Sequence, residues 1–372
     1  MKKSSNPGMR GRLFYLIVIT VFLSACSGNK AKELGSHLQR GEEYLQSSRY
    51  EEAVIEFKNV IQIDPKNAKG HYKLGLAYLK LGGINNLRMA FQELTKAVSL
   101  NPDIADAHLT LGELYLLSGE ADKAKEKADI ILSKEPGNLD GKVLLAGTLA
   151  ANKEFSEAVS LLEEVIKAKP DTIKPFMVLA SVHTAKKDYL SAEKTYKEAI
   201  AVKNNAVEPR MALANLYMMQ RKTLPAETQL KEASRIDPDN IQLLTGLANF
   251  YAAIKRHDDA EKNYEKVILK DPKNPGGYLA LAGFYRAIGQ AEKAHDVYKR
   301  GLSSVEVTDL LQKSLAEFLI EKGNYGEAGE QVSNIMKKRP KDFQGLYLRG
   351  RLRLAEMKVK EAIGDFQQSL KG

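Results

Sequence analysis

The apolar residues of this chain recur every three to four positions, and the same spacing returns in one segment after another. Leu213, Leu216 and Tyr217 form one such group. This spacing matches the period of an amphipathic helix, so the apolar side chains of a group share one helix face. Ala, Leu, Lys and Glu, all good helix formers, dominate the composition. The pattern predicts an all-α protein.

A ladder of alanines sets the length of the repeating unit. Its first step is 37 residues and each of the next eight is 34. The ladder consists of Ala53, Ala90, Ala124, Ala158, Ala192, Ala226, Ala260, Ala294, Ala328 and Ala362. A Gly or Ala stands upstream of each, usually after Leu, and a Pro usually follows downstream, as in Asp64-Pro65. Small residues on two helices let their axes approach, and Pro ends the second helix. Each period therefore predicts one helix pair.

The 34-residue period, with Leu-Gly/Ala, Ala and Pro at fixed places and Tyr often three residues after the small residue, resembles the tetratricopeptide repeat (TPR) family. The resemblance implies a superhelical solenoid of antiparallel helix pairs over residues 34–372. The units are expected at 34–67, 68–104, 105–138, 139–172, 173–206, 207–240, 241–274, 275–308, 309–342 and, in part, 343–372. Three extra residues near Gly82 and Gly83 predict a longer turn inside the second unit. The last unit lacks a polar capping helix, which favours a chain that continues in a longer protein.

The start of the chain has the features of an export signal followed by a lipid-attachment site. A basic segment, the apolar run 13–22 and Leu23-Ser24-Ala25-Cys26 have the layout of a secretory signal peptide. The uncharged stretch is too short to span a bilayer. The last four residues resemble the lipobox of bacterial lipoproteins. That resemblance implies a signal peptide over 1–25, cleavage between Ala25 and Cys26, palmitate and further acyl chains on Cys26, and a tether over 26–33. Ser27 after the cysteine favours the outer membrane of a Gram-negative bacterium.

Charge and cysteine content exclude several classes of function. The chain carries 56 Lys and Arg against 47 Asp and Glu, a net charge of +9. Removal of the signal peptide takes away four bases and no acid, which lowers the net charge to +5. Such a mild and mixed charge disfavours binding to nucleic acid. The single cysteine, Cys26, excludes an internal disulfide and a cysteine-based zinc site.

We find no catalytic motif in the sequence. Residues 137–143 approach a phosphate loop but are one residue short and lack its Ser or Thr. His37, His71 and His108 occupy the same repeat position, one whole unit apart, so they are expected to be structural rather than ligands of one metal. The sequence predicts a protein that is not an enzyme and needs no cofactor. An envelope enzyme stays open as an alternative class.

The TPR resemblance also implies a concave groove lined by the first helix of each unit. The repeat positions that face it in the family correspond here to Met177, Met211, Asn215, Met218, Met219, Thr245 and Asn249. Met adapts to irregular apolar partners, and Asn can pin a peptide backbone through its donor and acceptor. We interpret these residues as a site for an apolar or helical segment of a protein. The alternative is that Met fills gaps between helices and Asn is merely exposed.

Together these features predict a lipid-anchored scaffold or adaptor facing the periplasm, which binds protein partners and assists an envelope assembly or export machine. Export of exopolysaccharide, linked to exosortase, is mildly favoured on general likeness to such lipoproteins. Pilus secretin assembly and recruitment of cell-wall enzymes are alternatives. Direct binding of polysaccharide is another, and it would use exposed aromatic residues, for which Tyr72 and Tyr347 are the candidates at groove positions.

Overall fold

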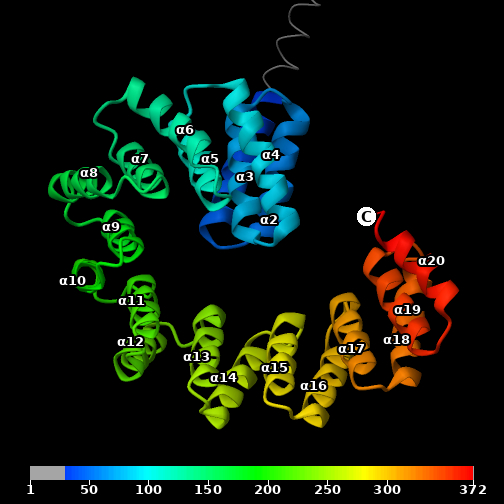
Figure 1. Ribbon diagram of the computed structural model, residues 1–372. Helices are drawn as coiled ribbons and strands as arrows, with labels where there is room; N and C mark the ends of the chain where they lie inside the picture. Colours follow the sequence, from blue (N-terminus) through cyan, green and yellow to red (C-terminus); the bar gives the residue numbers. More distant parts are fainter. Residues whose placement is uncertain (1–29, 372) are drawn as a thin grey trace, which may run out of the picture. The chain divides into compact units, whose positions relative to one another are not determined.

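The computed structural model describes residues 30–371, and all regular structure in that range is helical. The all-α repeat fold predicted from the sequence is confirmed. The predictions on Cys26 and the signal peptide lie outside the described residues. By its internal contacts the chain divides into two compact units, one ending at Thr195 and the other starting at Tyr196. Each unit is a series of antiparallel helix pairs stacked in chain order, as Figure 1 shows.

The described part of the first compact unit begins with a helix over residues 30–46. This helix starts within the stretch predicted as a tether (26–33) and continues into the predicted first repeat. It continues with α2 (Tyr50–Ile63), α3 (Ala68–Leu81), α4 (Ile84–Leu100), α5 (Ala105–Leu117), α6 (Ala121–Lys134), α7 (Leu139–Ala151), α8 (Phe155–Ala168) and α9 (Ile173–Ala185). Each even-numbered helix closes a repeat and packs against the helix before it and the helix after it.

Helix α10 (Tyr189–Val202) crosses the boundary between the two units, and the other helices of the second unit follow it. These helices are α11 (Glu208–Met219), α12 (Thr223–Ile236), α13 (Ile241–Ala253), α14 (His257–Lys270), α15 (Pro275–Ala287), α16 (Ala291–Ser304), α17 (Asp309–Glu321), α18 (Tyr325–Lys338), α19 (Phe343–Ala355) and α20 (Val359–Ser369). The odd-numbered helix is again the first of each repeat.

Small residues hold the two helices of a repeat together. The ladder alanines are completely buried, with at most 1% of their surface exposed. A Cβ added to Gly75 would lie 2.8 Å from Cγ of Leu94, and one added to Gly350 would lie 2.6 Å from the ring of Phe366. Only glycine leaves room for these side chains, so the sequence pattern of small residues reports a real close approach of helices.

The turn inside each repeat uses a residue in the left-handed region. In the fourth repeat Lys153 has φ of 66°, and the N–H of Glu154 donates to the carbonyl of Leu149, as in a Schellman motif. The second repeat differs, and the prediction of a longer turn there is wrong. Gly82 and Gly83 both have positive φ, 69° and 82°, and they reverse the chain in two residues. The three extra residues instead add one turn to the start of α4.

Candidate partner-binding groove

The predicted groove residues fall on first helices of the repeats. Four of them, Met211, Asn215, Met218 and Met219, lie on α11, and Thr245 and Asn249 lie on α13. Both helices belong to the second compact unit, and α12 lies between them in the chain. Met177 is half-buried on α9 in the first compact unit, so it is described apart from the other six.

The exposure of these residues separates open positions from packed ones. Met219 is 62% exposed, and the side chains of Asn215 and Asn249 are exposed as well. Met211 and Met218 are half-buried, and so they also contribute to packing between helices. Helix α13 has no charged residue in any of its positions. The surface offered by α11 and α13 is therefore mainly uncharged, with Met219 as its most accessible apolar side chain.

Internal hydrogen bonds limit what the polar groove residues can offer a partner. The hydroxyl of Thr245 donates to the carbonyl of Ile241 in its own helix, at 2.7 Å. The hydroxyl of Tyr264, on α14, donates to Oδ1 of Asn249 at 2.6 Å. The amide nitrogen of Asn249 stays available as a donor. Asn215 makes no side-chain hydrogen bond within residues 30–371, so it keeps both a donor and an acceptor.

A cavity of about 240 Å³ opens between α13, α14 and α15. Thr245 lines it, so one predicted groove residue belongs to a real hollow. Its full lining is Ile241, Thr245, Val267, Asp271, Asn274, Gly276, Gly277 and Ala280. Of these residues, only Thr245 was among the predicted groove residues. The signal that could have found the cavity is the pair Gly276-Gly277, which leaves the start of α15 without side chains.

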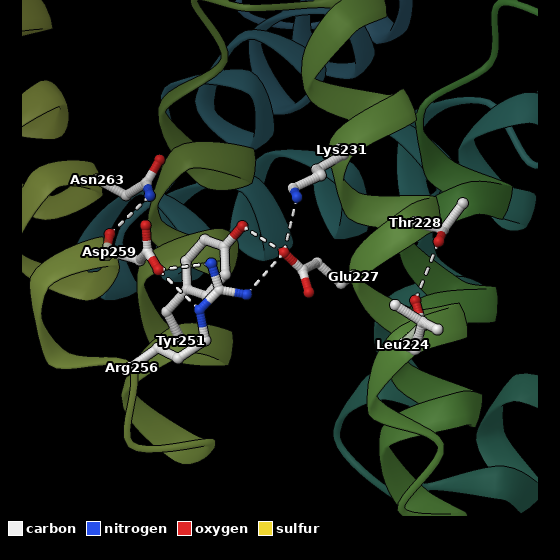
Figure 2. A network of polar contacts seen from close by, with 8 residues as sticks. All are labelled: Leu224, Glu227, Thr228, Lys231, Tyr251, Arg256, Asp259 and Asn263. Atoms are coloured by element: carbon white, nitrogen blue, oxygen red, sulfur yellow. Dashed lines mark hydrogen bonds and ion pairs between the residues drawn. The ribbon is translucent and has the colours of Figure 1, made fainter.

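A polar network fixes α13 against α12 (Figure 2). Oε1 of the buried Glu227 accepts from the hydroxyl of Tyr251 at 3.1 Å and from Nη1 of Arg256 at 2.9 Å. Nζ of Lys231 lies 2.8 Å from the same oxygen. The contact with Lys231 lowers the pKa of Glu227, and burial, then Glu227, raises the pKa of Tyr251 to about 12. A buried acid paired in this way is costly to remove. The network therefore sets how the sixth repeat meets the seventh.

The next junction uses the same residue types. Glu261 follows a ladder alanine as Glu227 does, and Oε2 of Glu261 lies 3.3 Å from Lys293 of the following repeat. Burial, followed by the hydrogen bond with Glu261, raises the pKa of Tyr285. An acid directly after the ladder alanine, together with the Tyr of the following repeat, thus indicates a joint between repeats.

The histidines are separate structural groups. Nδ1 of His37 lies 2.6 Å from Glu56, and Nδ1 of His71 lies 2.6 Å from Glu93. His37 and His71 thus each have a carboxylate partner within their own repeat. Over residues 30–371 no three His, Cys, Asp or Glu side chains gather where they could hold a metal ion.

No described helix combines the length and the apolar character needed to cross a bilayer. This finding covers residues 30–371 and leaves the start of the chain aside.

Family models match two stretches of the chain. One described as "TPR repeat" matches residues 41–82, and one described as "Tetratricopeptide repeat" matches residues 241–274. The chain contains tetratricopeptide repeats. The second match covers the seventh TPR unit, which carries Thr245 and Asn249. TPR units imply a surface for protein–protein interaction.

Curated relatives match about a third of the chain. DnaJ homolog subfamily C member 3 of Mus musculus is 24% identical over 129 residues, which is 35% of this chain and 25% of the relative. Superkiller complex protein 3 of Homo sapiens is 28% identical over 120 residues, 32% of this chain and 7% of that protein. The matches thus span at most about a quarter of the length of these two relatives.

Solved TPR structures also resemble the chain. The TPR domain of P58(IPK) is 19% identical, with a TM-score of 0.32 over 91% of this chain and 92% of that one. The pilF protein of Pseudomonas aeruginosa is 21% identical, with a TM-score of 0.39 over 59% of this chain and 97% of that one.

Proposed function

We propose that this chain is a lipid-anchored TPR scaffold of the Gram-negative envelope, held on the outer membrane through Cys26 and facing the periplasm. It binds protein partners through the first helices of its repeats and assists an assembly or export machine, with exopolysaccharide export mildly favoured over pilus secretin assembly or recruitment of cell-wall enzymes. The TPR units support the scaffold role, and the sequence around Cys26 supports the anchor. The proposal includes no catalytic step and no cofactor.

The observation that carries the binding role is the surface of α11 and α13. It combines an accessible Met219, an unpaired Asn215 and a cavity lined by Thr245. An apolar side chain of a partner fits such a cavity, and the amide of Asn215 on α11 can hydrogen-bond to another part of the same partner. The absence of charge on α13 favours an apolar or helical segment over an acidic or basic one.

Site-specific photo-crosslinking in living cells tests this role. A photoreactive residue replaces Met219 in the full lipidated chain, and Leu269, which is 77% exposed on α14, is replaced in a matched control. We expect a discrete adduct at position 219 and none at 269. Met211→Glu with Asn215→Ala should lower the adduct about tenfold, since each 1.4 kcal/mol of lost affinity is a factor of ten. Equal adducts at both positions, or an adduct that survives the double variant, would refute the groove site.

The anchor has a test of its own. Cells fed labelled palmitate should incorporate the label into the wild-type chain and not into Cys26→Ala, because the thiol is the acyl acceptor. Label in the variant would show that another residue carries the lipid. Unlabelled wild-type protein would refute the anchor without bearing on the groove.

A second candidate function, polysaccharide binding, has one observation in its favour. Tyr347 and Phe343 lie one turn apart on α19 and are each 45% exposed. The guanidinium of Arg351 lies 5.8 Å from the ring centre of Tyr347. Tyr72, the other aromatic candidate, is half-buried, and burial raises its pKa to about 12. Binding of an anionic glycan that is lost in high salt and in Tyr347→Ala would favour this function.

A further inference from the structure

The extra turn of α4 exposes an apolar stripe. Ile84 is 80% exposed, Leu87 is 47% exposed and Phe91 is 36% exposed. Spacings of three and four residues place these side chains on one face of the helix. Second helices of the other repeats begin at the position of Leu87, so Ile84 belongs to the three residues that only this repeat has. The ring of Phe91 packs edge-on against that of Tyr115 on α5 and keeps about a third of its surface exposed. Packing inside the array therefore accounts in part for Phe91, but not for the two more exposed side chains, Ile84 and Leu87.

Two cations flank the stripe. Lys80 is in the last turn of α3, and Arg88 is next to Leu87. Both are exposed, and neither takes part in an ion pair within residues 30–371. The first turn of α4 contains no acid. Exposed apolar side chains next to unpaired cations, here on the end of α3 and the start of α4, are the combination found in helices that lie at a membrane surface.

Helix α4 packs close to the first helix of the array, which follows the proposed anchor in the chain. Ala90 of α4 belongs to the same hydrophobic cluster as Leu38 and Tyr44 of the first helix. That helix begins at Lys30, four residues after Cys26. Four residues span at most about 14 Å. A lipid on Cys26 would therefore hold this first part of the array beside the headgroups of the bilayer.

We propose that α4 rests on an anionic phospholipid surface through Ile84, Leu87 and Phe91, with Arg88 and Lys80 contacting the headgroups. This contact rests on the proposed anchor for its place in the cell, but it is a property of the folded array and is measurable without lipid on Cys26. Several acyl chains on Cys26 would already anchor the protein stably, so this contact serves to orient the array on the membrane. It fixes which side of the first repeats faces the bilayer.

Vesicle binding tests the contact directly. The probe protein starts at residue 26 with Cys26→Ser, which removes acylation and keeps every helix over residues 30–371. The vesicles contain phosphatidylcholine alone or with about 30% phosphatidylglycerol. We expect co-sedimentation with the anionic vesicles only. Ile84→Asp with Leu87→Asp should lower the partition coefficient about tenfold or more, and Arg88→Glu about fivefold, because apolar burial and headgroup attraction both contribute.

Leu269→Asp is the matched control, since Leu269 is as exposed as Ile84 but lies on α14 of the second compact unit. It should leave vesicle binding unchanged, and circular dichroism should show equal helicity for all variants. Failure of the parent protein to bind, or equal loss in Leu269→Asp, would overturn the proposal. So would a dimer in solution that Ile84→Asp with Leu87→Asp dissociates while vesicle binding is absent, because the stripe would then be a protein interface. Palmitate labelling of Cys26 is independent of each of these results.

Discussion

The second and third TPR repeats carry the same histidine in two different settings. Nε2 of His71 lies 3.1 Å from the carbonyl oxygen of Pro65, and Nε2 of His108 lies 3.1 Å from that of Pro102. Both rings thus join the first helix of a repeat to the turn before it. Nδ1 of His71 lies 2.6 Å from Oε2 of Glu93. Nδ1 of His108 is buried and has no hydrogen-bond partner among residues 30–371.

The difference comes from one residue on the second helix. Lys127 occupies the repeat position that Glu93 occupies in the second repeat and Glu56 in the first. Nζ of Lys127 lies 2.6 Å from Oε1 of the neighbouring Glu126 instead. Burial, with a smaller contribution from Lys127, lowers the pKa of His108. The repeat pattern therefore specifies the helices, while polar pairs between them are specified residue by residue.

The largest change in the free energy of unfolding should come from giving the second repeat the lysine that the third repeat carries. Glu93→Lys leaves Nδ1 of the buried His71 unpaired, which costs about 1–3 kcal/mol of unfolding free energy. Urea unfolding followed by circular dichroism measures it. Gln92→Lys, which places a lysine at the exposed neighbouring position and leaves the pair of His71 with Glu93 in place, is the control. Equal stability of the two variants would show that the pair with Glu93 contributes nothing.

The reverse change should make the third repeat like the second. Lys127→Glu gives Nδ1 of His108 a carboxylate partner, and we expect about 0.5–1.5 kcal/mol of added stability, the net value of a hydrogen bond. The same urea titration measures it. A loss of stability would mean that the helices of the third repeat hold the two side chains too far apart.

Acid should act on the third repeat through His108. Its pKa in the folded state is lowered, so the unfolded chain binds the proton more readily. The contribution of neutral His108 is complete above the unfolded pKa of about 6.5 and is lost as the pH falls through the folded pKa. Lys127→Glu should reduce this loss. NMR titration of the His108 ring checks the direction, and a pKa at or above the usual value in the wild type would contradict it.

The smallest change in the free energy of unfolding is expected from a substitution in the first repeat. Glu56→Gln keeps an oxygen that accepts from His37 and Arg40, and we expect a change of about 0.5 kcal/mol or less. Thermal unfolding of the wild type and the variant measures it. A cost as large as that of Glu93→Lys would show that charge, rather than hydrogen bonding, stabilises these pairs.

The alanine ladder predicted the fold because two helices can pack closely only where small residues lie between them. Ala192 and its equivalents are fully buried, as the close approach of two helices requires. The turn of the second repeat was predicted wrongly because length alone does not show that Gly82 and Gly83 both take positive φ. The groove was predicted only in outline. Whether the oxygen of Asn249 is free depends on Tyr264, a neighbour on another helix that a list of groove positions does not contain.

The joint at Glu227 has a consequence for how the array unfolds. In repeat proteins stability is roughly the sum of each repeat and its contacts with the next, so unfolding spreads from weak junctions and stops at strong ones. Tyr251, Arg256 and Lys231 all converge on one carboxylate between the sixth and seventh repeats. We expect fraying from the C-terminal repeats to halt there, so that hydrogen exchange of α11 and α12 is slower than that of α19 and α20. The sixth repeat, which carries Met211, Asn215, Met218 and Met219, would then keep its shape while α19 and α20 open and close.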